Sequence, residues 1–165
     1  MSEIFESTAE VRPAVPDDIA PVLDMVRELA EFEHLSDQVV ATEADYQESL
    51  FGANPVAEAL VAEFDGQLVG YAIFFSTFST FIGRSGLWLE DLYVRPEYRK
   101  QGIGKKLLKA GGARAAERGS GRYEWSVLDW NQNAIDLYTQ VGGEILDEWR
   151  TVRMDRKAIE ALPEK

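Results

Sequence analysis

A strand-like segment that runs into a glycine turn and then into a basic helix is the feature that most constrains how this chain can fold. Residues 87–94 are mostly apolar, and the pattern Arg99-x-x-Gly102-x-Gly104 follows them at the start of a helix-like segment. A turn of this type directs several backbone N–H groups and a helix N-terminus at one place, which suits a phosphate group. A strand and a helix therefore meet at a candidate anion site, an arrangement that fits a mixed α/β protein.

Two commoner phosphate motifs do not fit this turn. A P-loop requires Gly-Lys followed by serine or threonine, whereas Gly104 is followed by Lys105 and Lys106. A dinucleotide-binding fingerprint requires a third glycine three positions after Gly104, where Leu107 stands. The motif alone is also compatible with a plain strand-to-helix corner that binds nothing.

Charge is distributed unevenly along the chain. The net charge is -12, yet residues 95–122 contain nine Lys or Arg and two Glu, a net charge of +7. The remaining residues contain eight Lys or Arg and 27 Asp or Glu. A basic block in an acidic protein indicates an anionic ligand, although a solvated helix face that balances acidic neighbours would look the same. The acidic remainder would repel nucleic acid, so we expect no nucleic-acid partner.

Length and composition indicate an ordinary globular protein. The 165 residues, 45% of them hydrophobic, suffice for one domain with a hydrophobic core. The chain has no cysteine, which excludes disulfides and thiolate chemistry and is compatible with a reducing cytoplasm. The acidic N-terminal residues do not resemble a signal peptide, and no apolar run approaches the length of a membrane span. We therefore expect a cytoplasmic protein with one domain at residues 1–165 and no membrane partner.

Periodicity and turn signals predict a mixed α/β sheet. Strands are expected at residues 10–14, 57–64, 67–77, 87–94, 123–128 and 144–155. Helices are expected at residues 19–30, 42–51, 102–118 and 133–141, with one or two further helical turns from residue 156. Thr42 and Asp45 form a capping box, Asp65-Gly66 forms a hairpin turn, and residues 78–86 form a loop with exposed aromatic rings.

With these segments in place, the chain resembles the GCN5-related N-acetyltransferases (GNAT proteins). The glycine turn after residues 91–94 looks like their acetyl-CoA signature, and the similarity is greatest to the diamine acetyltransferases that act on spermidine, spermine or thialysine. Further matching segments cover nearly the whole chain: Arg12-Pro-Ala, Glu28-Leu-Ala-Glu-Phe-Glu33, Thr42-Glu, Val61-Ala-Glu, Val69-Gly-Tyr, Leu89-Glu-Asp and Trp130-Asn131 to Tyr138. The resemblance implies a mostly antiparallel mixed sheet flanked by helices in a single domain, and a homodimer.

The same resemblance implies acetyl-CoA as cosubstrate and no metal. The backbone of the turn would hold the diphosphate, the end of the preceding strand would pair with the pantetheine arm, and Asn131 with its neighbours would also contact that arm. The coenzyme-binding residues implied in this way are Leu92, Tyr93, Val94, Arg99, Lys100, Gln101, Gly102, Ile103, Gly104, Lys105, Asn131, Asn133 and Ala134. The basic block at residues 95–122 would then have an anionic ligand.

Tyr138 is the first expected catalytic residue. Acetyl transfer to an amine needs a neutral nucleophile, a polarised thioester carbonyl and a proton for the departing thiolate. Tyr138 matches the tyrosine that the family places beside the sulfur, so the resemblance implies that it is the general acid. The residues alone also allow Tyr138 to be an ordinary core residue of an amphipathic helix.

Glu90 is the second expected catalytic residue. It stands in an apolar run, where a carboxylate is costly unless it is paired or wet. The resemblance implies that an acid at this place binds the acceptor amine and accepts its proton, and that Asp91 beside it also binds the acceptor. By spacing alone, Glu90 and Asp91 could instead alternate out of a half-exposed strand.

Two more residues are candidates for acceptor binding. Glu33 matches a polyamine-contacting acid of the family, although a solvated acid at a helix end fits the residues equally well. Phe81 lies in the expected aromatic loop, where the family often has tryptophan and where this chain is one residue longer, so the exact amine stays open. His34, the only histidine, is expected near the same site with no catalytic or metal-binding role.

The charge outside the basic block favours a cationic acceptor, because long-range attraction raises its local concentration. Together with the resemblance, this predicts direct acetyl transfer, in a ternary complex, to a small polyamine, diamine or thialysine-like amine. Two alternatives stay open: acetylation of a protein, peptide or antibiotic amine, and a coenzyme-binding module without turnover.

Overall fold

The computed structural model describes residues 8–164, and residues 1–7 and 165 lie outside the described part. The chain divides into two compact units, Met1–Ser126 and Val127–Lys165, and each is considered by itself. None of the helices at residues 8–164 combines the length and the apolar character that crossing a membrane requires.

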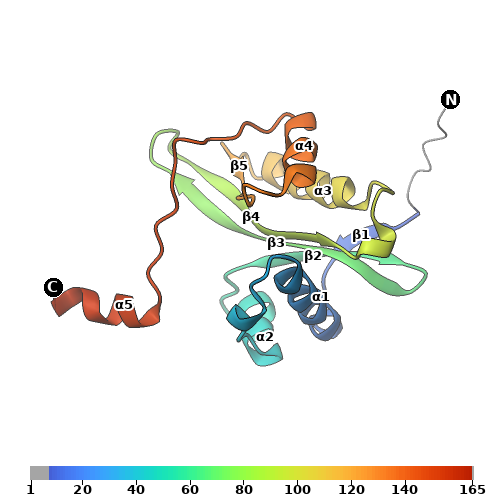
Figure 1. The fold of residues 1–165 in the computed structure, drawn as a ribbon, viewed down its shortest axis with the longest axis horizontal. Coiled ribbons are helices and arrows are strands. Elements are labelled where there is room, and N and C mark those ends of the chain that lie inside the picture. Colours follow the sequence, from blue (N-terminus) through green and yellow to red (C-terminus); the bar gives the residue numbers. More distant parts are fainter. Residues whose placement is uncertain (1–7, 165) are drawn as a thin grey trace. The chain divides into compact units, whose positions relative to one another are not determined.

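The first unit is built on a five-stranded sheet (Figure 1). Its strands lie side by side in chain order: β1 (Glu10–Pro13), β2 (Glu58–Phe64), β3 (Gln67–Ser79), β4 (Arg84–Val94) and β5 (Tyr123–Glu124). Neighbouring strands are antiparallel except β4 and β5, which are parallel. The expected mixed, mostly antiparallel α/β sheet is confirmed.

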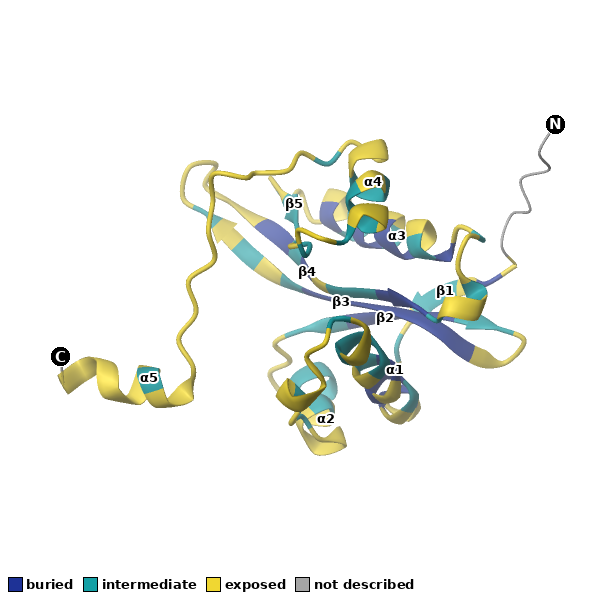
Figure 2. Cartoon of the chain, in the orientation of Figure 1, coloured by how far each residue is buried: buried dark blue, intermediate teal, exposed yellow. Residues whose placement is uncertain are grey.

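Helices cover both faces of this sheet. The helices α1 (Ile19–Phe32) and α2 (Glu43–Phe51) lie on one face, and α3 (Ile103–Glu117) lies on the other (Figure 1). The apolar side of α1 brings Val22 and Met25 into the core cluster beneath it. Burying one such side chain contributes about 1.5–3 kcal/mol, and buried residues concentrate where the helices meet the sheet (Figure 2).

Local signals predicted two element boundaries correctly. The Thr42 hydroxyl accepts a hydrogen bond from the Asp45 N–H at 3.3 Å, and the Thr42 N–H donates to Asp45 Oδ2 at 2.8 Å, which caps α2 as expected. Asp65 and Gly66 join β2 to β3 with φ angles of 48° and 76°. Positive φ at both central residues is what a tight two-residue hairpin needs, so this turn is also confirmed.

The prediction of a loop over residues 78–86 is wrong. Strand β3 continues to Ser79 and β4 begins at Arg84, so only residues 80–83 form the turn. Phe78 still pairs with Ser85 across the hairpin although it is 69% exposed. Backbone pairing extends this end of the hairpin without a buried face, and for that reason the pattern of apolar residues did not reveal it.

Gly111, the first of two adjacent glycines inside α3, has a packing reason. The Tyr123 ring of β5 lies against Gly111 and Gly112, and its hydroxyl donates to the Leu108 carbonyl at 3.1 Å. A Cβ at Gly111 would overlap this hydroxyl group. The Tyr123 ring therefore needs the space that a side chain at Gly111 would fill, whereas a Cβ at Gly112 would lie 3.7 Å from the ring in ordinary contact.

The second unit contains α4 (Gln132–Gln140) and α5 (Arg156–Ala161), with a short 3-10 helix (Leu162–Glu164) at its end. The side chain of Asp155 caps α5 by accepting from the Ala158 N–H at 2.8 Å. The helix expected at residues 133–141 and the helical turns expected from residue 156 are confirmed.

The strand expected at residues 144–155 is wrong, and the one expected at 123–128 is reduced to the two residues of β5. A strand needs a neighbouring backbone with which to pair and a face to bury. Residues 144–155 have neither within the described chain, since Trp149 is 76% exposed and Val152 is 90% exposed. Figure 2 shows the segment that leads to α5 as almost entirely exposed.

Candidate functional site

The glycine turn joins β4 to α3 within the first unit. A short 3-10 helix (Pro96–Tyr98) follows β4, and α3 begins at Ile103 with Gly102 as its N-cap. Within residues 8–164, no side chain caps this end of the helix. The first N–H groups of a helix have no acceptor within the helix, and they carry the positive end of its dipole. The turn therefore has the backbone arrangement of an anion site.

The backbone of the turn is strained in a way that suits a ligand. Lys100 and Gly102 have φ angles of 62° and 79°, a left-handed conformation that costs a non-glycine residue about 1–2 kcal/mol. Gly104 has no such angle, and a Cβ there would meet only Val94 Cγ2 at 3.8 Å. The protein itself has room for a side chain at Gly104, so a ligand that approaches the backbone closely would account for the glycine. These residues fit a diphosphate group.

Arg99 has a structural task in this turn. Its Nε donates to the Val94 carbonyl at 2.8 Å, which ties the turn to the end of β4. Its guanidinium carbon lies 5.5 Å from the ring centroids of both Phe32 and Tyr93. These contacts fix the start of the turn against the end of α1, and the coenzyme contact expected of Arg99 stays a prediction.

The edge of β4 beside the turn is open in part. Strand β5 pairs with β4 only at Leu87 and Trp88. Beyond Trp88, no strand among residues 8–126 pairs with this edge of β4, which includes the expected pantetheine-binding residues Leu92, Tyr93 and Val94. An extended ligand can add to such an edge as another strand would.

A β-bulge places Glu90 and Asp91 on the same face of the sheet. Asp91 pairs with Ile73, and Leu89 pairs with the next residue, Phe74, so Glu90 is an extra residue in β4. An extra residue interrupts the alternation of side chains. Both carboxyl groups therefore lie on the face of the sheet that α1 and α2 cover. The alternative in which Glu90 and Asp91 alternate between the two faces of the strand is wrong.

The two carboxyl groups have different partners on this face. The Tyr71 hydroxyl donates to Asp91 Oδ2 at 3.0 Å, and Tyr71 is completely buried in the core cluster with α1. The Trp88 Nε1 donates to Glu90 Oε2 at 2.9 Å, and Glu90 is exposed. Asp91 is thus anchored in the core, whereas Glu90 lies at the surface.

Burial and neighbouring acids change the proton affinity of this site. Burial raises the pKa of Asp91 from 3.8 to about 6; the Tyr71 hydrogen bond lowers it, and the charges of Glu90 and Glu33 raise it. Burial also raises the pKa of Glu33, which directly follows α1. Burial and the charge of Asp91 raise the pKa of Tyr46, in α2, to about 12.

We call Glu33, Glu90 and Asp91 the acid cluster. The charges of Glu33 and Glu90 both raise the pKa of Asp91, so these three sequence-predicted residues act on one another electrostatically. None of the ion pairs formed by residues 8–164 includes any of them. The cluster therefore presents negative charge that an ammonium group would balance.

Phe81 and His34 are both exposed, but only His34 is next to a member of the acid cluster in the chain. Phe81 is 96% exposed at the tip of the β3–β4 hairpin, and no contact brings it to the acids. His34 follows Glu33 with a φ of 60° and is exposed. His34 is thus a surface residue next to Glu33 in the chain, and a role for Phe81 in acceptor binding stays a prediction.

The remaining predicted site residues belong to the second unit. Asn131 caps α4, and its Oδ1 accepts from the Ala134 N–H at 3.4 Å. Asn133 lies exposed in the first turn of α4, and Tyr138 is half-buried toward its end. The coenzyme contacts and the acid role expected of these residues stay predictions.

Sequence reasoning missed Tyr71, Tyr46 and Trp88. Tyr71 ends the matching segment Val69-Gly-Tyr, which assigns it no role, and Tyr46 and Trp88 stand in segments that read as ordinary amphipathic or core elements. The pairing of β3 with β4 could have suggested Tyr71, but the bulge at Glu90 changes which residues share a face. Nothing in the residues of β4 marks that bulge.

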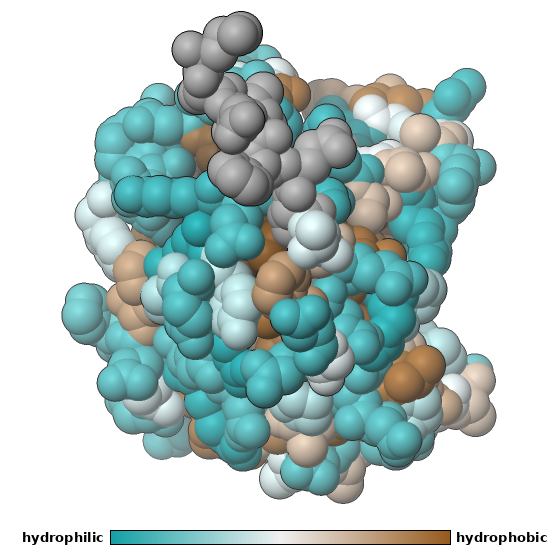
Figure 3. Space-filling model, turned by 90° about the vertical axis from the view of Figure 1, so that its right-hand side faces the viewer, coloured by the Kyte–Doolittle hydropathy of each residue, from teal (hydrophilic) through white to brown (hydrophobic). Residues whose placement is uncertain are grey.

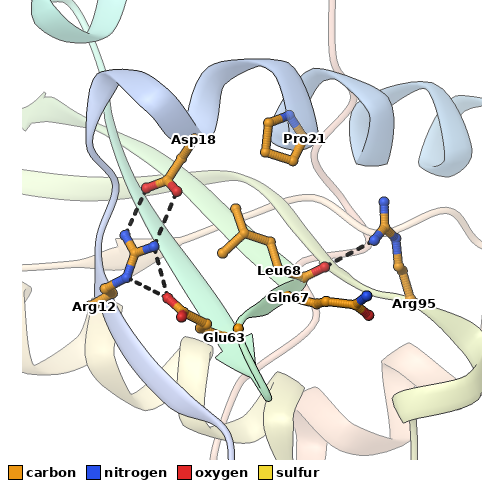
Figure 4. Close-up of a pocket in the computed structure, with 8 residues that line it drawn as sticks. Arg12, Asp18, Pro21, Glu63, Gln67, Leu68 and Arg95 are labelled. Carbon is orange, nitrogen blue, oxygen red and sulfur yellow. Dashed lines mark hydrogen bonds and ion pairs between the residues drawn. The ribbon is translucent and has the colours of Figure 1, made fainter.

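A hollow of about 440 Å³ lies elsewhere in the first unit, between β1, the β2–β3 turn and α1 (Figure 4). No sequence-predicted site residue lines it. Arg12 pairs there with Asp18 at 2.7 Å and with Glu63 at 2.9 Å, and Arg95 donates to the Leu68 carbonyl at 3.0 Å. These groups satisfy one another, so they form a structural network.

The surface at the end of the sheet with the β2–β3 turn is mainly hydrophilic. Figure 3 shows this side of the molecule, with apolar colour only in small separate patches. It offers no broad apolar face, and the acid cluster and the glycine turn are the features of the first unit that point to ligands.

Comparisons with known proteins agree with this geometry. Residues 23–142 match the model of the acetyltransferase (GNAT) family. A thialysine N-epsilon-acetyltransferase of Sus scrofa is 40% identical over 94% of this chain and 97% of its own length. An L-ornithine N5-acetyltransferase of Arabidopsis thaliana is 28% identical over 93% of this chain and 87% of its own length.

Solved structures share the fold. An integron cassette protein of V. cholerae has a TM-score of 0.78 and 20% identity, and the match covers 96% of this chain and 99% of that protein. An aminoglycoside acetyltransferase from an uncultured soil metagenomic sample has a TM-score of 0.74 and 19% identity, with coverages of 90% and 100%. At these identities the likeness concerns the fold alone.

Proposed function

The chain belongs to the GNAT acetyltransferase family, and from this premise we propose that it transfers an acetyl group from acetyl-CoA to the primary amine of a small cationic acceptor. The transfer is direct, within a ternary complex of the chain, acetyl-CoA and the amine. The acceptor class comprises polyamines, diamines and amino acids with a side-chain amine; the relatives named for thialysine and ornithine support the last of these.

The acid cluster is the observation that carries this proposal. Glu90 and Asp91 lie on one face of β4, and the charge of Glu33, which follows α1, acts on Asp91. Ion pairs within the described chain do not neutralise these three carboxyl groups. Such a surface attracts a cation over a distance and binds it once it arrives. An acidic acceptor would meet repulsion there, and a neutral one would cover carboxylates without balancing them.

The glycine turn supports the coenzyme half of the proposal. Backbone N–H groups of residues 100–105 would hold the diphosphate, helped by Lys100 and Lys105, and the open edge of β4 would pair with the pantetheine arm. Acetyl-CoA, when bound, supplies the acetyl group as an activated thioester. The protein supplies the placement of the amine beside it.

The individual roles follow from the resemblance and from the chemistry. Glu90 and Asp91 bind the ammonium group, one of these two carboxylates takes its proton, and Tyr138 donates a proton to the departing thiolate. Asn131 and its neighbours Asn133 and Ala134 contact the pantetheine arm. No metal ion takes part. One GNAT domain that spans both units, and a homodimer, complete the proposal on the basis of the family alone.

The test is release of the CoA thiol from acetyl-CoA with a panel of amines: thialysine, ornithine, spermidine, putrescine, an aminoglycoside and a lysine-containing peptide. We expect strong selectivity for small cationic amines. Turnover of only the peptide or only the aminoglycoside would replace the proposed acceptor class. Binding of acetyl-CoA without turnover of any amine would favour a coenzyme-binding module.

A matched pair of variants separates the acid cluster from general charge. Glu31 is an exposed acid on α1, two residues before Glu33. Glu33→Gln should raise the KM for the amine by about ten-fold, the effect of losing one favourable charge interaction at a partly buried site, whereas Glu31→Gln should leave it unchanged. Equal effects of the two substitutions would mean that only net charge matters.

A further inference from the structure

The two acids at the bulge differ in how firmly they are held. Glu90 is the extra residue of β4, it is exposed, and its carboxylate accepts from the Trp88 indole at 2.9 Å. Asp91 lies in the regular ladder opposite Ile73, and its Oδ2 accepts from the buried Tyr71 hydroxyl at 3.0 Å. Asp91 is therefore the carboxylate that the core positions.

The second oxygen of Asp91 is open. Among residues 8–164, the Tyr71 hydroxyl is the one group that donates to Asp91, and it occupies Oδ2. No buried side-chain oxygen in this part of the chain lacks a hydrogen-bond partner. Because Oδ1 has no such partner, it is not fully enclosed by the protein. One oxygen is thus anchored and the other is available to an incoming ammonium group.

The surroundings of Asp91 favour uptake of a proton. Glu90 on the same strand and Glu33 at the end of α1 add negative charge, and Tyr46 of α2 also lies near, with Arg27 of α1 beyond it. Burial and these acids raise the pKa of Asp91 to about 6, although the hydrogen bond from Tyr71 lowers it. A general base works best when its pKa lies near the working pH.

These observations deepen the proposed function and rest on it. We propose that Asp91, held by the Tyr71 hydroxyl, accepts the proton of the acceptor ammonium, and that Glu90 attracts and orients the amine without taking the proton. Tyr71 is then a positioning residue, since it acts only through Asp91. This division of roles differs from the sequence-based expectation, which assigned the proton to Glu90.

The step balances as follows. Asp91 Oδ1 takes one proton from the ammonium group and later releases it to solvent. The freed nitrogen lone pair forms the new bond to the acetyl carbon while the carbon–sulfur bond breaks. Tyr138, the proposed donor, gives a proton to the CoA sulfur. The nitrogen then loses its second proton, which returns Tyr138 to its protonated form.

The kinetic test is the pH dependence of kcat/KM with the best amine of the panel. The wild type should lose activity on the acid side around the pKa of Asp91, about 6. Asp91→Asn should remove this acid limb and lower kcat by about 100-fold or more, whereas Glu90→Gln should keep the limb and mainly raise KM. An acid limb that survives Asp91→Asn and disappears in Glu90→Gln would overturn the proposal.

Tyr71→Phe tests the positioning role with the carboxylate intact. Loss of a hydrogen bond to the ionised form should move the acid limb to higher pH by about one unit. Tyr123→Phe is the matched control, because it also removes one hydroxyl and one hydrogen bond, in this case to the Leu108 carbonyl. It should leave the limb in place; an equal shift in both variants would refute the role of Tyr71.

A readout without turnover separates this inference from the proposed function. Carbon-13 titration of the aspartate carboxyl carbons, with the Asp91 signal identified by its absence in Asp91→Asn, should show a midpoint near pH 6 that rises in Tyr71→Phe. A midpoint at the ordinary value near 3.8 refutes the inference and leaves amine acetylation standing. A midpoint near pH 6, as expected, combined with no acetylation of any amine refutes the proposed function and the catalytic role together.

Discussion

Asp91→Asn should change how the stability of the protein depends on pH, whatever its effect on activity. In the folded chain the carboxyl group of Asp91 is largely removed from water and surrounded by other acids, and its pKa is raised to about 6. In the unfolded chain the same group is solvated and has an ordinary pKa near 3.8. The asparagine side chain keeps an oxygen that can accept from Tyr71 but has no proton to bind.

The sign and size of the effect follow from these two pKa values. A carboxyl group that binds its proton more tightly in the folded chain stabilises the fold as pH falls below about 6, and the gain is complete below about 3.8. Each unit of difference corresponds to about 1.4 kcal/mol, so the full gain is about 3 kcal/mol. Between roughly pH 7.5 and roughly pH 5, the wild type should gain about 1.4 kcal/mol relative to Asp91→Asn.

Urea unfolding at these two pH values measures the effect. All other titrating groups are present in both proteins, so the difference between their pH dependences reports Asp91 together with its electrostatic effect on Glu33 and Glu90. Asp17→Asn, at an exposed position beside the start of α1, is the control and should follow the wild type. If wild type and Asp91→Asn change in parallel with pH, Asp91 is not buried among acids and the reasoning fails.

Four glycine-related substitutions give further expected outcomes. Gly111→Ala should lose about 1–3 kcal/mol of stability in urea unfolding, because the new Cβ overlaps the Tyr123 hydroxyl. Gly112→Ala should gain up to about 1 kcal/mol, because its Cβ would lie 3.7 Å from the ring and alanine favours a helix. The reverse order of stabilities would contradict this packing. Gly104→Ala should keep or raise stability but weaken acetyl-CoA binding by about ten-fold or more in calorimetry, and unchanged affinity would exclude a ligand at this backbone. Lys100→Gly should raise the unfolding free energy by up to about 1 kcal/mol through relief of a left-handed residue, and a loss would show that the turn is not strained there.

Much of the first unit could be predicted because its signals are local. The capping box at Thr42 and the turn at Asp65-Gly66 each depend on residues that are adjacent or three apart. The glycine turn was placed correctly between β4 and α3 for the same reason. Such signals depend on no contact between distant parts of the chain, so they can be recognised in the sequence.

The features that failed or were missed depend on distant pairing. The bulge at Glu90 exists only through the register of β4 against β3, and it decides that Glu90 and Asp91 share a face. The contact of Tyr71 with Asp91 spans twenty positions and has no motif. Residues 144–155 show the converse: their apolar pattern predicts a strand, but no backbone partner is present in the described chain.

The acid cluster also illustrates a conflict between stability and function. A carboxylate buried beside other acids lowers the stability of the folded chain near neutral pH. Departures of this kind from what folding alone favours are expected at functional sites. In this chain the loss of folding stability arises at Asp91, the residue that we propose accepts the proton of the ammonium group, and this agrees with that role.

The most direct test of the account compares putrescine with butylamine as acceptors, since both have four-carbon chains and only putrescine carries a second ammonium group. The account predicts that kcat/KM for putrescine exceeds that for butylamine by about ten-fold or more, because the acid cluster holds more negative charge than one ammonium balances. The ratio should fall toward one in Glu33→Gln and stay high in Glu31→Gln. Equal use of the two amines by the wild type, or a ratio that Glu33→Gln leaves unchanged, would contradict the claim that this cluster selects a cationic acceptor.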